Sequence, residues 1–215
     1  MNAVLDNADL YWEGFRTTLS LALLAGVIAL VIGTLLAALR VSPIPPLRML
    51  GTAYVEIVRN TPLTVVFFFT VFVMPQLDIQ IPFFASAVVA LSIYTAAFVC
   101  EAVRSGINSV GPGQAEAARS VGLTFPQVLR HVVLPQALRS VVPPLVNVLI
   151  ALAKNTSVAG GFFVAELFGV GKRLTNAFSG DVLAVLIGIA LGYLIITVPA
   201  GVLANRLERR LAVAR

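Results

Sequence analysis

Charged residues are scarce in this sequence of 215 residues. Asp, Glu, Lys and Arg make up 12% of it, 59% of the residues are hydrophobic, and the mean hydropathy is +0.95. Soluble domains contain about 25% charged residues. The composition therefore excludes an ordinary soluble domain and indicates an integral membrane protein.

Cysteine and histidine are each present once, as Cys100 and His131. One cysteine cannot form an internal disulfide, and one histidine without grouped Cys, Asp or Glu at zinc-like spacing predicts no metal site. The sequence also lacks the GxxxxGK[ST] motif that holds nucleotide phosphates. We therefore expect no metal and no cofactor to be bound by this chain.

Long uncharged stretches are the dominant pattern. Residues 17–39, 60–77, 79–100 and 182–205 lack charge over about the 20 residues that a membrane-spanning helix needs, and a fifth apolar stretch covers 140–153. We predict an all-α integral membrane protein, with one domain over residues 1–215 and about five transmembrane helices. The predicted spans are 15–40, 58–77, 82–107, 139–160 and 182–206, with a loop at 108–137 and an external segment at 162–181.

The first apolar stretch could instead be a cleaved signal peptide. A signal peptide begins with basic residues, whereas Asp6, Asp9 and Glu13 precede this stretch. We therefore expect a retained helix.

The basic residues predict the orientation, because Lys and Arg near span ends stay cytoplasmic. With the N-terminus outside, the outer segments contain only Arg16, Lys172 and Arg173. The inner segments then contain Arg40, Arg48, Arg59, Arg104, Arg119, Arg130, Arg139, Arg206, Arg209, Arg210 and Arg215. The C-terminus and the 108–137 loop are thus predicted to be cytoplasmic. The net charge of +5 reflects this topology and does not indicate a nucleic-acid partner.

The cytoplasmic loop is polar enough to be a surface element. Gln114 to Val121 predicts a helix that Gly122 ends, and Thr124 can cap a second short helix that Leu134 and Pro135 end. Small alanines on the first helix would permit close docking in a groove of a partner. Glu116 and Arg119 lie three residues apart and could pair on its exposed side.

The loop resembles a known motif. Glu116, Ala117 and Ala118, followed by Gly122 and then by Val132, Leu134 and Pro135 at fixed spacing, resemble the EAA loop of ABC importer permeases. The stretches VRNTPL (58–63), YTAAFVCEAVRSGINSVGPGQ (94–114) and PPLVNVLIALAKNTSV (143–158) are similar to polar amino acid permeases. The chain departs from their pattern at Asn60, Val132 and Asn155, where Gly, Ile and Asp are usual.

The resemblance implies a type I ABC importer permease fold with a cytoplasmic coupling-helix loop. The implied function is that of the permease subunit of an ATP-driven importer for polar amino acids in a prokaryotic cytoplasmic membrane. The chain would be no enzyme, because a cytoplasmic partner subunit would bind ATP and magnesium. A second permease, either the same chain or a sister chain, and an external solute-binding protein would complete the assembly.

Other functions remain open. An ordinary amphipathic loop would need no partner, and a stand-alone channel or ion-coupled carrier would need no docking loop. A permease of the same family could carry another small solute. A membrane enzyme is disfavoured, because no group of nucleophile, base and orienting residue is discernible.

Four residues are candidates for coupling to the ATPase. They are Glu116, Ala117, Ala118 and Gly122, which would seat a short rigid helix in the partner. Gly122 is also explained as a simple helix stop.

Polar residues within the apolar spans are candidates for the solute path, because they are costly at membrane depth unless they are paired or line a wet cavity. Lys154 lies about ten residues, or roughly 15 Å of helix, beyond Pro144, which places it near the membrane midplane. The candidates are Asn147, Lys154, Asn155, Thr156, Ser157, Glu101 and Arg104. The alternatives are a polar seam between permeases for the Lys154 group and a structural ion pair for Glu101 and Arg104.

Asn155 bears on the choice of solute. Asn155 is uncharged where relatives carry Asp, so the charge of Lys154 has no adjacent carboxylate. The midplane of the membrane then carries a net positive charge, which favours acidic amino acids such as glutamate or aspartate.

Two further segments are less specific. Arg59, Asn60, Thr61 and Pro62 open the second span and could form a gate or an interface, although ordinary interfacial anchoring also explains them. Residues 165–180 are too polar to cross the membrane, and a short interfacial helix or gate facing the binding protein, with Lys172 and Arg173 at its surface, is as consistent as a solvated loop.

Overall fold

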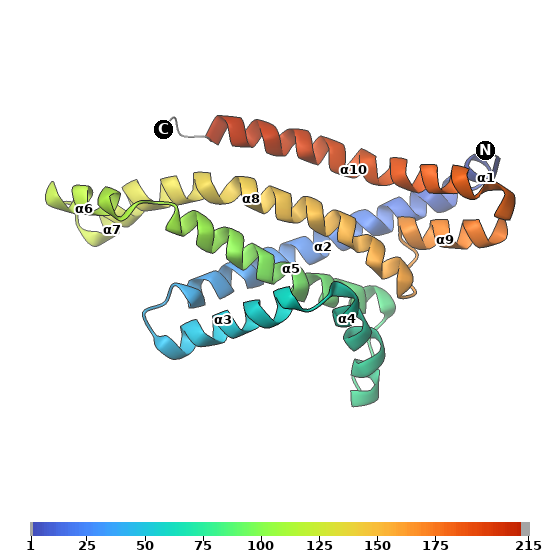
Figure 1. Ribbon diagram of the computed structural model, residues 1–215, viewed down its shortest axis with the longest axis horizontal. Helices are drawn as coiled ribbons and strands as arrows, with labels where there is room; N and C mark the ends of the chain where they lie inside the picture. Colours follow the sequence, from blue (N-terminus) through green and yellow to red (C-terminus); the bar gives the residue numbers. More distant parts are fainter. Residues whose placement is uncertain (1, 212–215) are drawn as a thin grey trace.

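The computed structural model describes residues 2–211, and every element over that range is a helix (Figure 1). Arg215, which the sequence predicts to be cytoplasmic, lies outside the described residues. Four long helices form the bundle: α2 (Ala8–Arg40), α5 (Phe83–Asn108), α8 (Leu134–Asn155) and α10 (Val182–Leu211). Helix α5 packs between α2 and α8, and α10 packs against α8. This arrangement confirms the predicted all-α fold.

Shorter helical segments precede or connect the long ones. They are α1 (Asn2–Leu5), α3 (Pro45–Asn60), α4 (Leu63–Phe68), α6 (Pro112–Ser120), α7 (Phe125–Val128) and α9 (Leu167–Ala177), together with the π-helical segments η1 (Phe69–Val73) and η3 (Leu129–Val133) and the 3-10 segments η2 (Met74–Leu77), η4 (Thr156–Gly161) and η5 (Ser179–Asp181).

Small residues let the long helices approach closely. A Cβ atom on Gly33 of α2 would overlap the side chain of Val99 and lie 2.7 Å from the carbonyl oxygen of Ala96. On the other face of α5, a Cβ atom on Gly106 would lie 3.0 Å from Cα of Val141 in α8. Membrane helices associate through such close packing, because lipid offers no hydrophobic driving force between them. The glycines therefore determine where α2 and α8 cross α5.

The predicted second span is divided in the structure. Within residues 2–211, four helices are long and apolar enough to cross a membrane, and a fifth span exists if α3 and the 63–77 helix count as one. These two helices are bent by 102° at Thr61, whose ψ of 130° is extended. Pro62 explains the break, because the residue before proline is disfavoured in helical conformation. The range 58–77 thus begins inside α3, and its crossing of the membrane remains a prediction.

The second loop helix does not end at Leu134 and Pro135. It continues from α7 through η3 into α8, so that 125–161 form one long helical segment. Proline lacks an N–H group and its ring would clash with a carbonyl one turn earlier. The wider π turn of η3 directly before α8 provides the room, as π-bulges do in other helices. The expectation of a helix stop here is wrong.

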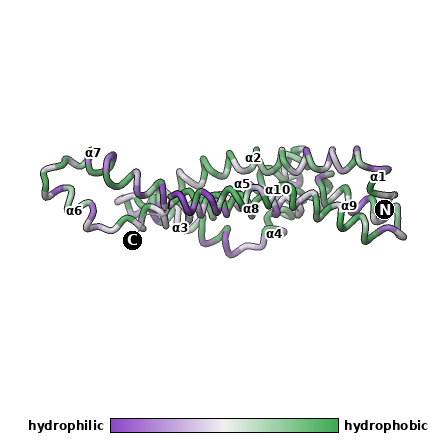
Figure 2. The backbone as a smooth tube through the Cα atoms, turned by 90° about the horizontal axis from the view of Figure 1, so that it is seen from above, coloured by the Kyte–Doolittle hydropathy of each residue, from purple (hydrophilic) through white to green (hydrophobic). Residues whose placement is uncertain are grey.

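The two ends of the bundle differ. Figure 1 shows α6, α7 and the C-terminal end of α10 at one end, with the N-terminus and α9 at the opposite end. In Figure 2, α6 and α7 carry both hydrophilic and hydrophobic stretches, a strongly hydrophilic run lies between them and the α5 label, and much of the remaining tube is hydrophobic. Large apolar side chains such as Leu23, Leu183 and Ile195 are exposed on α2 and α10. A bilayer around the middle of the bundle would cover them.

Candidate translocation cavity and coupling loop

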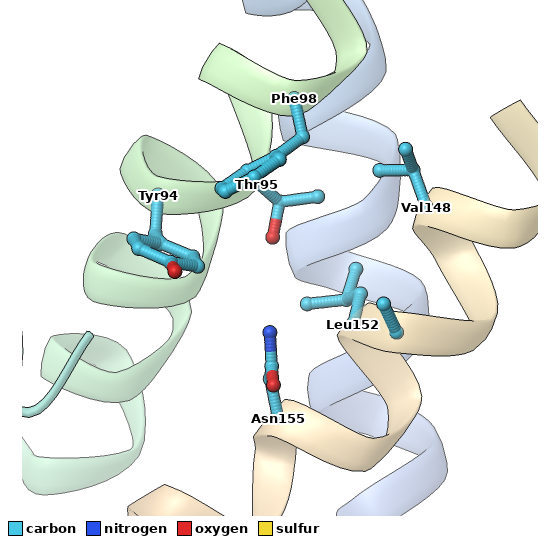
Figure 3. A pocket seen from close by; sticks show the side chains of 7 residues that line it. Tyr94, Thr95, Phe98, Val148, Leu152 and Asn155 are labelled. Atoms are coloured by element: carbon cyan, nitrogen blue, oxygen red, sulfur yellow. The ribbon is translucent and has the colours of Figure 1, made fainter. Parts of the chain in front are cut away.

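A cavity of about 210 Å³ lies between α5 and α8 (Figure 3). Apolar side chains form most of its wall, and three polar groups are available in it, from Tyr94, Thr95 and Asn155. Figure 3 shows the Thr95 hydroxyl and the Asn155 amide pointing into the same space, with Phe98 to one side of it. A mostly apolar wall with a few convergent polar groups is typical of small-molecule sites.

Only Asn155 of the predicted Lys154 group reaches this cavity. Thr156 is buried, and its hydroxyl donates to the carbonyl oxygen of Ala153 at 2.8 Å. The Ser157 hydroxyl donates to the carbonyl oxygen of Lys154, also at 2.8 Å. Successive residues of a helix point in different directions, so adjacent polar residues do not form one cluster. The two hydroxyls are therefore occupied by the backbone.

Lys154 and Asn147 lie on another face of α8, where both are exposed. Their spacing of seven residues places them on one side of the helix, as the sequence predicts. An exposed polar stripe is the placement that contact with a second permease would require. Their role remains a prediction.

Glu101 is the centre of an arginine cluster. Its carboxylate pairs with Arg40 from the end of α2, with Arg104 at 3.4 Å and with Arg59 from the end of α3 at 3.6 Å. The predicted pair of Glu101 and Arg104 is present, but Arg40, which the sequence analysis did not single out as a site residue, makes the shortest contact. It lies 61 residues earlier in the chain, so only the packing of α2 on α5 brings the two together.

The arginine cluster adjoins the cavity. One carboxylate faces three guanidinium groups, which leaves an excess of positive charge. The guanidinium of Arg59 lies 5.6 Å from the ring centroid of Phe98, within the range of a cation–π interaction. Phe98 also lines the cavity. A single aromatic ring therefore separates the cavity from the positive charge.

The predicted gate residues form the bend between α3 and α4. The Asn60 amide donates to the carbonyl oxygen of Glu56 at 2.7 Å, and the Thr61 hydroxyl donates to that of Ile57 at 2.8 Å. These bonds close the last turn of α3, and Pro62 precedes α4. The residues thus determine the local backbone, and a gating role remains a prediction.

The loop that follows the C-terminal end of α5 has the predicted order of helix, glycine turn and helix. Gly122 has φ of +90°, a conformation that other residues adopt at a cost. The N–H groups of Gly122 and Leu123 donate to the carbonyls of Arg119 and Ala118 at 3.0 and 3.2 Å, which is the hydrogen-bond pattern of a Schellman cap. Gly122 therefore acts as the helix stop that the sequence predicts.

The next helix begins with a side-chain cap. The N–H and the hydroxyl of Thr124 both donate to Oε1 of Gln127, at 2.8 and 2.9 Å. This arrangement and the Gly122 turn make the loop a rigid unit rather than a flexible connector.

The surface of this loop is partly apolar. Glu116 and Ala117 are exposed, whereas Ala118 is buried. Val121 is 78% exposed and Phe125 68% exposed. The structure records no ion pair between Glu116 and Arg119. A helix tip with exposed large apolar side chains suits contact with another protein, and Ala118 would take part by supporting the tip from within.

Glu166, which the sequence analysis overlooked, is a fully buried carboxylate. It caps α9 by accepting hydrogen bonds from the N–H groups of Phe168 and Gly169 at 3.0 and 2.7 Å. Burial raises the pKa of this carboxyl, and its hydrogen bonds oppose that shift. The segment that it begins is a helix, α9, with Lys172 and Arg173 exposed. The cap residue itself could have been found from the sequence, because Asp and Glu are favoured at helix N-termini.

No group of three or more His, Cys, Asp or Glu side chains within 2–211 could hold a metal ion. The fold and the site together define a class: a multi-pass helical membrane protein with a small, mostly apolar cavity between two helices and a helical loop at one end. Residues 29–213 match the family of the inner membrane component of binding-protein-dependent transport systems, and the chain belongs to this family. It is thus a multi-pass inner-membrane protein.

Its relatives are permease subunits. The chain is 40% identical to the probable glutamine ABC transporter permease protein GlnM of Bacillus subtilis over 98% of this chain and 97% of that protein. It is 40% identical to the glutamate transport system permease protein GluC of Corynebacterium glutamicum over 94% and 93%. The structure of an amino acid ABC transporter crystallised with histidines superposes with a TM-score of 0.90 at 32% identity, covering 96% of each chain. The fold is that of type I ABC importer permeases, as the resemblance in the sequence implies.

Proposed function

We propose that this chain is the membrane-spanning permease subunit of an ATP-driven importer for polar amino acids, with acidic amino acids favoured. The observation that carries the proposal is the cavity between α5 and α8, where Thr95 and Asn155 converge beside the arginine cluster. Relatives at 40% identity are named for glutamine and glutamate, which agrees with an amino acid as solute.

The preference for acidic solutes follows from charge. No carboxylate lines the cavity, and the carboxylate nearest to it along α5, Glu101, is already paired with three arginines. A solute carboxylate beside Phe98 would therefore meet excess positive charge. Asn155 adds a neutral donor and acceptor where Asp would repel an anion. Basic solutes would lack a counter-charge in this site.

The partners follow from the two ends of the bundle. We assign the end with Val121 and Phe125 to a cytoplasmic ATP-binding subunit, which would hold ATP and magnesium, so that this chain is no enzyme. Glu116, Ala117, Ala118 and Gly122 would transmit the motion of that subunit. The N-terminus would then be outside and the C-terminus cytoplasmic. The end with α9 would face a solute-binding protein, and the exposed face of α8 a second permease of the same or a sister chain.

Uptake into proteoliposomes tests the proposal. The chain is reconstituted with a candidate ATP-binding subunit and a candidate solute-binding protein. Uptake of labelled glutamate is then followed with ATP or with a non-hydrolysable analogue inside the vesicles. We expect uptake of labelled glutamate to require ATP. Unlabelled glutamate, aspartate or glutamine should reduce this uptake more than unlabelled arginine does. Equal uptake by the chain alone without ATP would support the alternative of a channel or carrier. Stronger competition by arginine would contradict the acidic preference.

A further inference from the structure

Glu166 is the buried charged residue for which neither the cavity nor the coupling loop provides a role. Its exposed fraction is 0%, and no lysine or arginine among the described residues pairs with it. An ionised carboxylate without a cation is costly in an apolar bundle. Such a group is expected to persist only where hydrogen bonds and a helix N-terminus compensate for its burial.

Three separate helices supply those compensating contacts. The first is α9 itself, through the Phe168 and Gly169 N–H groups described above. The second is α10, from which the Tyr193 hydroxyl donates to Oε2 at 2.5 Å. The third is α2, where the Thr18 hydroxyl lies 3.5 Å from Oε2 and accepts the N–H of Leu167 at 3.1 Å. One side chain thus ties α9 to two of the long helices.

A fourth contact leads toward the cavity. Gly160 lies directly against Glu166, because a Cβ atom there would overlap Oε1 and lie 2.6 Å from the N–H nitrogen of Gly169. Gly160 belongs to η4, the 3-10 segment that begins immediately after Asn155. The contact between Gly160 and Glu166 therefore joins η4, which follows the cavity residue Asn155, to the start of α9.

We propose that Glu166 is a positioning residue that links the outer helix α9 to the cavity, an inference that rests on the proposed function. It holds the start of α9, the η4 turn, α2 and α10 in one arrangement. A displacement of α9 by a docking protein consequently moves η4, and with it Asn155. The surface of α9 carries Lys172 and Arg173, which are exposed and available for that docking.

The link requires a carboxylate. Phe168, Gly169 and Tyr193 all donate to Glu166, and a carboxylate accepts at both oxygens. In Glu166→Gln one of these oxygens becomes an NH₂ group, which cannot accept and would oppose a donor. Tyr193→Phe removes the tie to α10 alone and leaves the cap of α9 in place.

The experiment measures ATP hydrolysis by the whole transporter in nanodiscs, with and without glutamate-loaded binding protein. The variants are Glu166→Gln and Tyr193→Phe. The matched control is Glu13→Gln, which removes an exposed carboxylate from α2 at the same end of the bundle. Thermal stability and hydrolysis without binding protein are measured for each, because a merely structural defect lowers these as well.

We expect Glu166→Gln to lower the stimulation by binding protein by about tenfold, with unstimulated hydrolysis within about twofold of wild type, as for a lost coupling between sites. Tyr193→Phe should show a smaller loss of the same kind, and Glu13→Gln none. Unchanged stimulation in both network variants, an equal loss in Glu13→Gln, or a parallel loss of stability and unstimulated hydrolysis would each overturn the inference. A wild-type complex that glutamate-loaded binding protein does not stimulate would instead count against the proposed function.

Discussion

Removal of the Glu101 charge should destabilise the bundle strongly. Glu101→Gln keeps the shape of the side chain but leaves Arg40, whose side chain is only 8% exposed, without its counter-ion. Breaking a buried ion pair costs about 3–5 kcal/mol. Arg59 and Arg104 are 42% and 37% exposed and can be solvated, so we take the lower end, about 3 kcal/mol.

This cost is large enough to measure as a melting shift. In a chain of this size, each kcal/mol of lost stability lowers the melting temperature by about 2–4 °C, so the melting midpoint should fall by about 6–12 °C. The assay heats the detergent-solubilised protein and quantifies the remaining monodisperse peak by size-exclusion chromatography. Arg59→Gln is the control, because an ion pair at 3.6 Å with a partly exposed partner is worth about 0–1 kcal/mol.

The double variant Arg40→Met and Glu101→Gln distinguishes the ion pair from general damage. It removes both charges of this part-buried pair and replaces the guanidinium with an apolar chain, so it should regain more than half of the lost stability. The reasoning about this cluster is wrong if the losses in stability caused by the two substitutions are additive. It is also wrong if Glu101→Gln melts within about 2 °C of wild type.

Three further changes test other parts of the structure. Asn155→Asp places a carboxylate in the cavity, so competition by glutamate in the uptake assay should weaken by about tenfold, as for an unfavourable charge contact of about 1.4 kcal/mol; unchanged competition would show that Asn155 does not meet the solute. Gly122→Ala forces a non-glycine residue to φ of +90°, at a cost of about 1–2 kcal/mol, and should reduce co-purification of the ATP-binding subunit. Gly113→Ala is the control, because Gly113 has open space around it, and it should not reduce co-purification. Gly33→Ala should lower stability by about 1–3 kcal/mol through overlap with Val99, and a melting temperature equal to wild type would contradict the close packing of α2 on α5.

Local chemistry in the sequence predicts much of this fold. The apolar runs mark α2, α5 and α10, because a helix that spans a bilayer needs an uninterrupted apolar length. The turn at Gly122 and the cap at Thr124 were also predictable, since each depends on a few neighbouring residues.

Features that depend on distant parts of the chain were not predictable in this way. The contact of Arg40 with Glu101 and the tie of Glu166 to Tyr193 exist only after the helices pack. The continuation of the helix through Pro135 depends on a π turn that no sequence pattern marks. The different placement of Thr156 and Asn155 also depends on packing, because adjacent residues on a helix face different surroundings.

Site-specific cross-linking tests the central claim most directly, namely that the α6–α7 tip is the surface that the ATP-binding subunit holds. A photoreactive amino acid is placed at Val121, which is 78% exposed at that tip, or at Leu183, which is 73% exposed at the opposite end. The assembled transporter is then irradiated in membranes. We expect a cross-link to the ATP-binding subunit from position 121 and none from position 183. Cross-linking from 183, or none from 121 in a complex that hydrolyses ATP, would contradict the account.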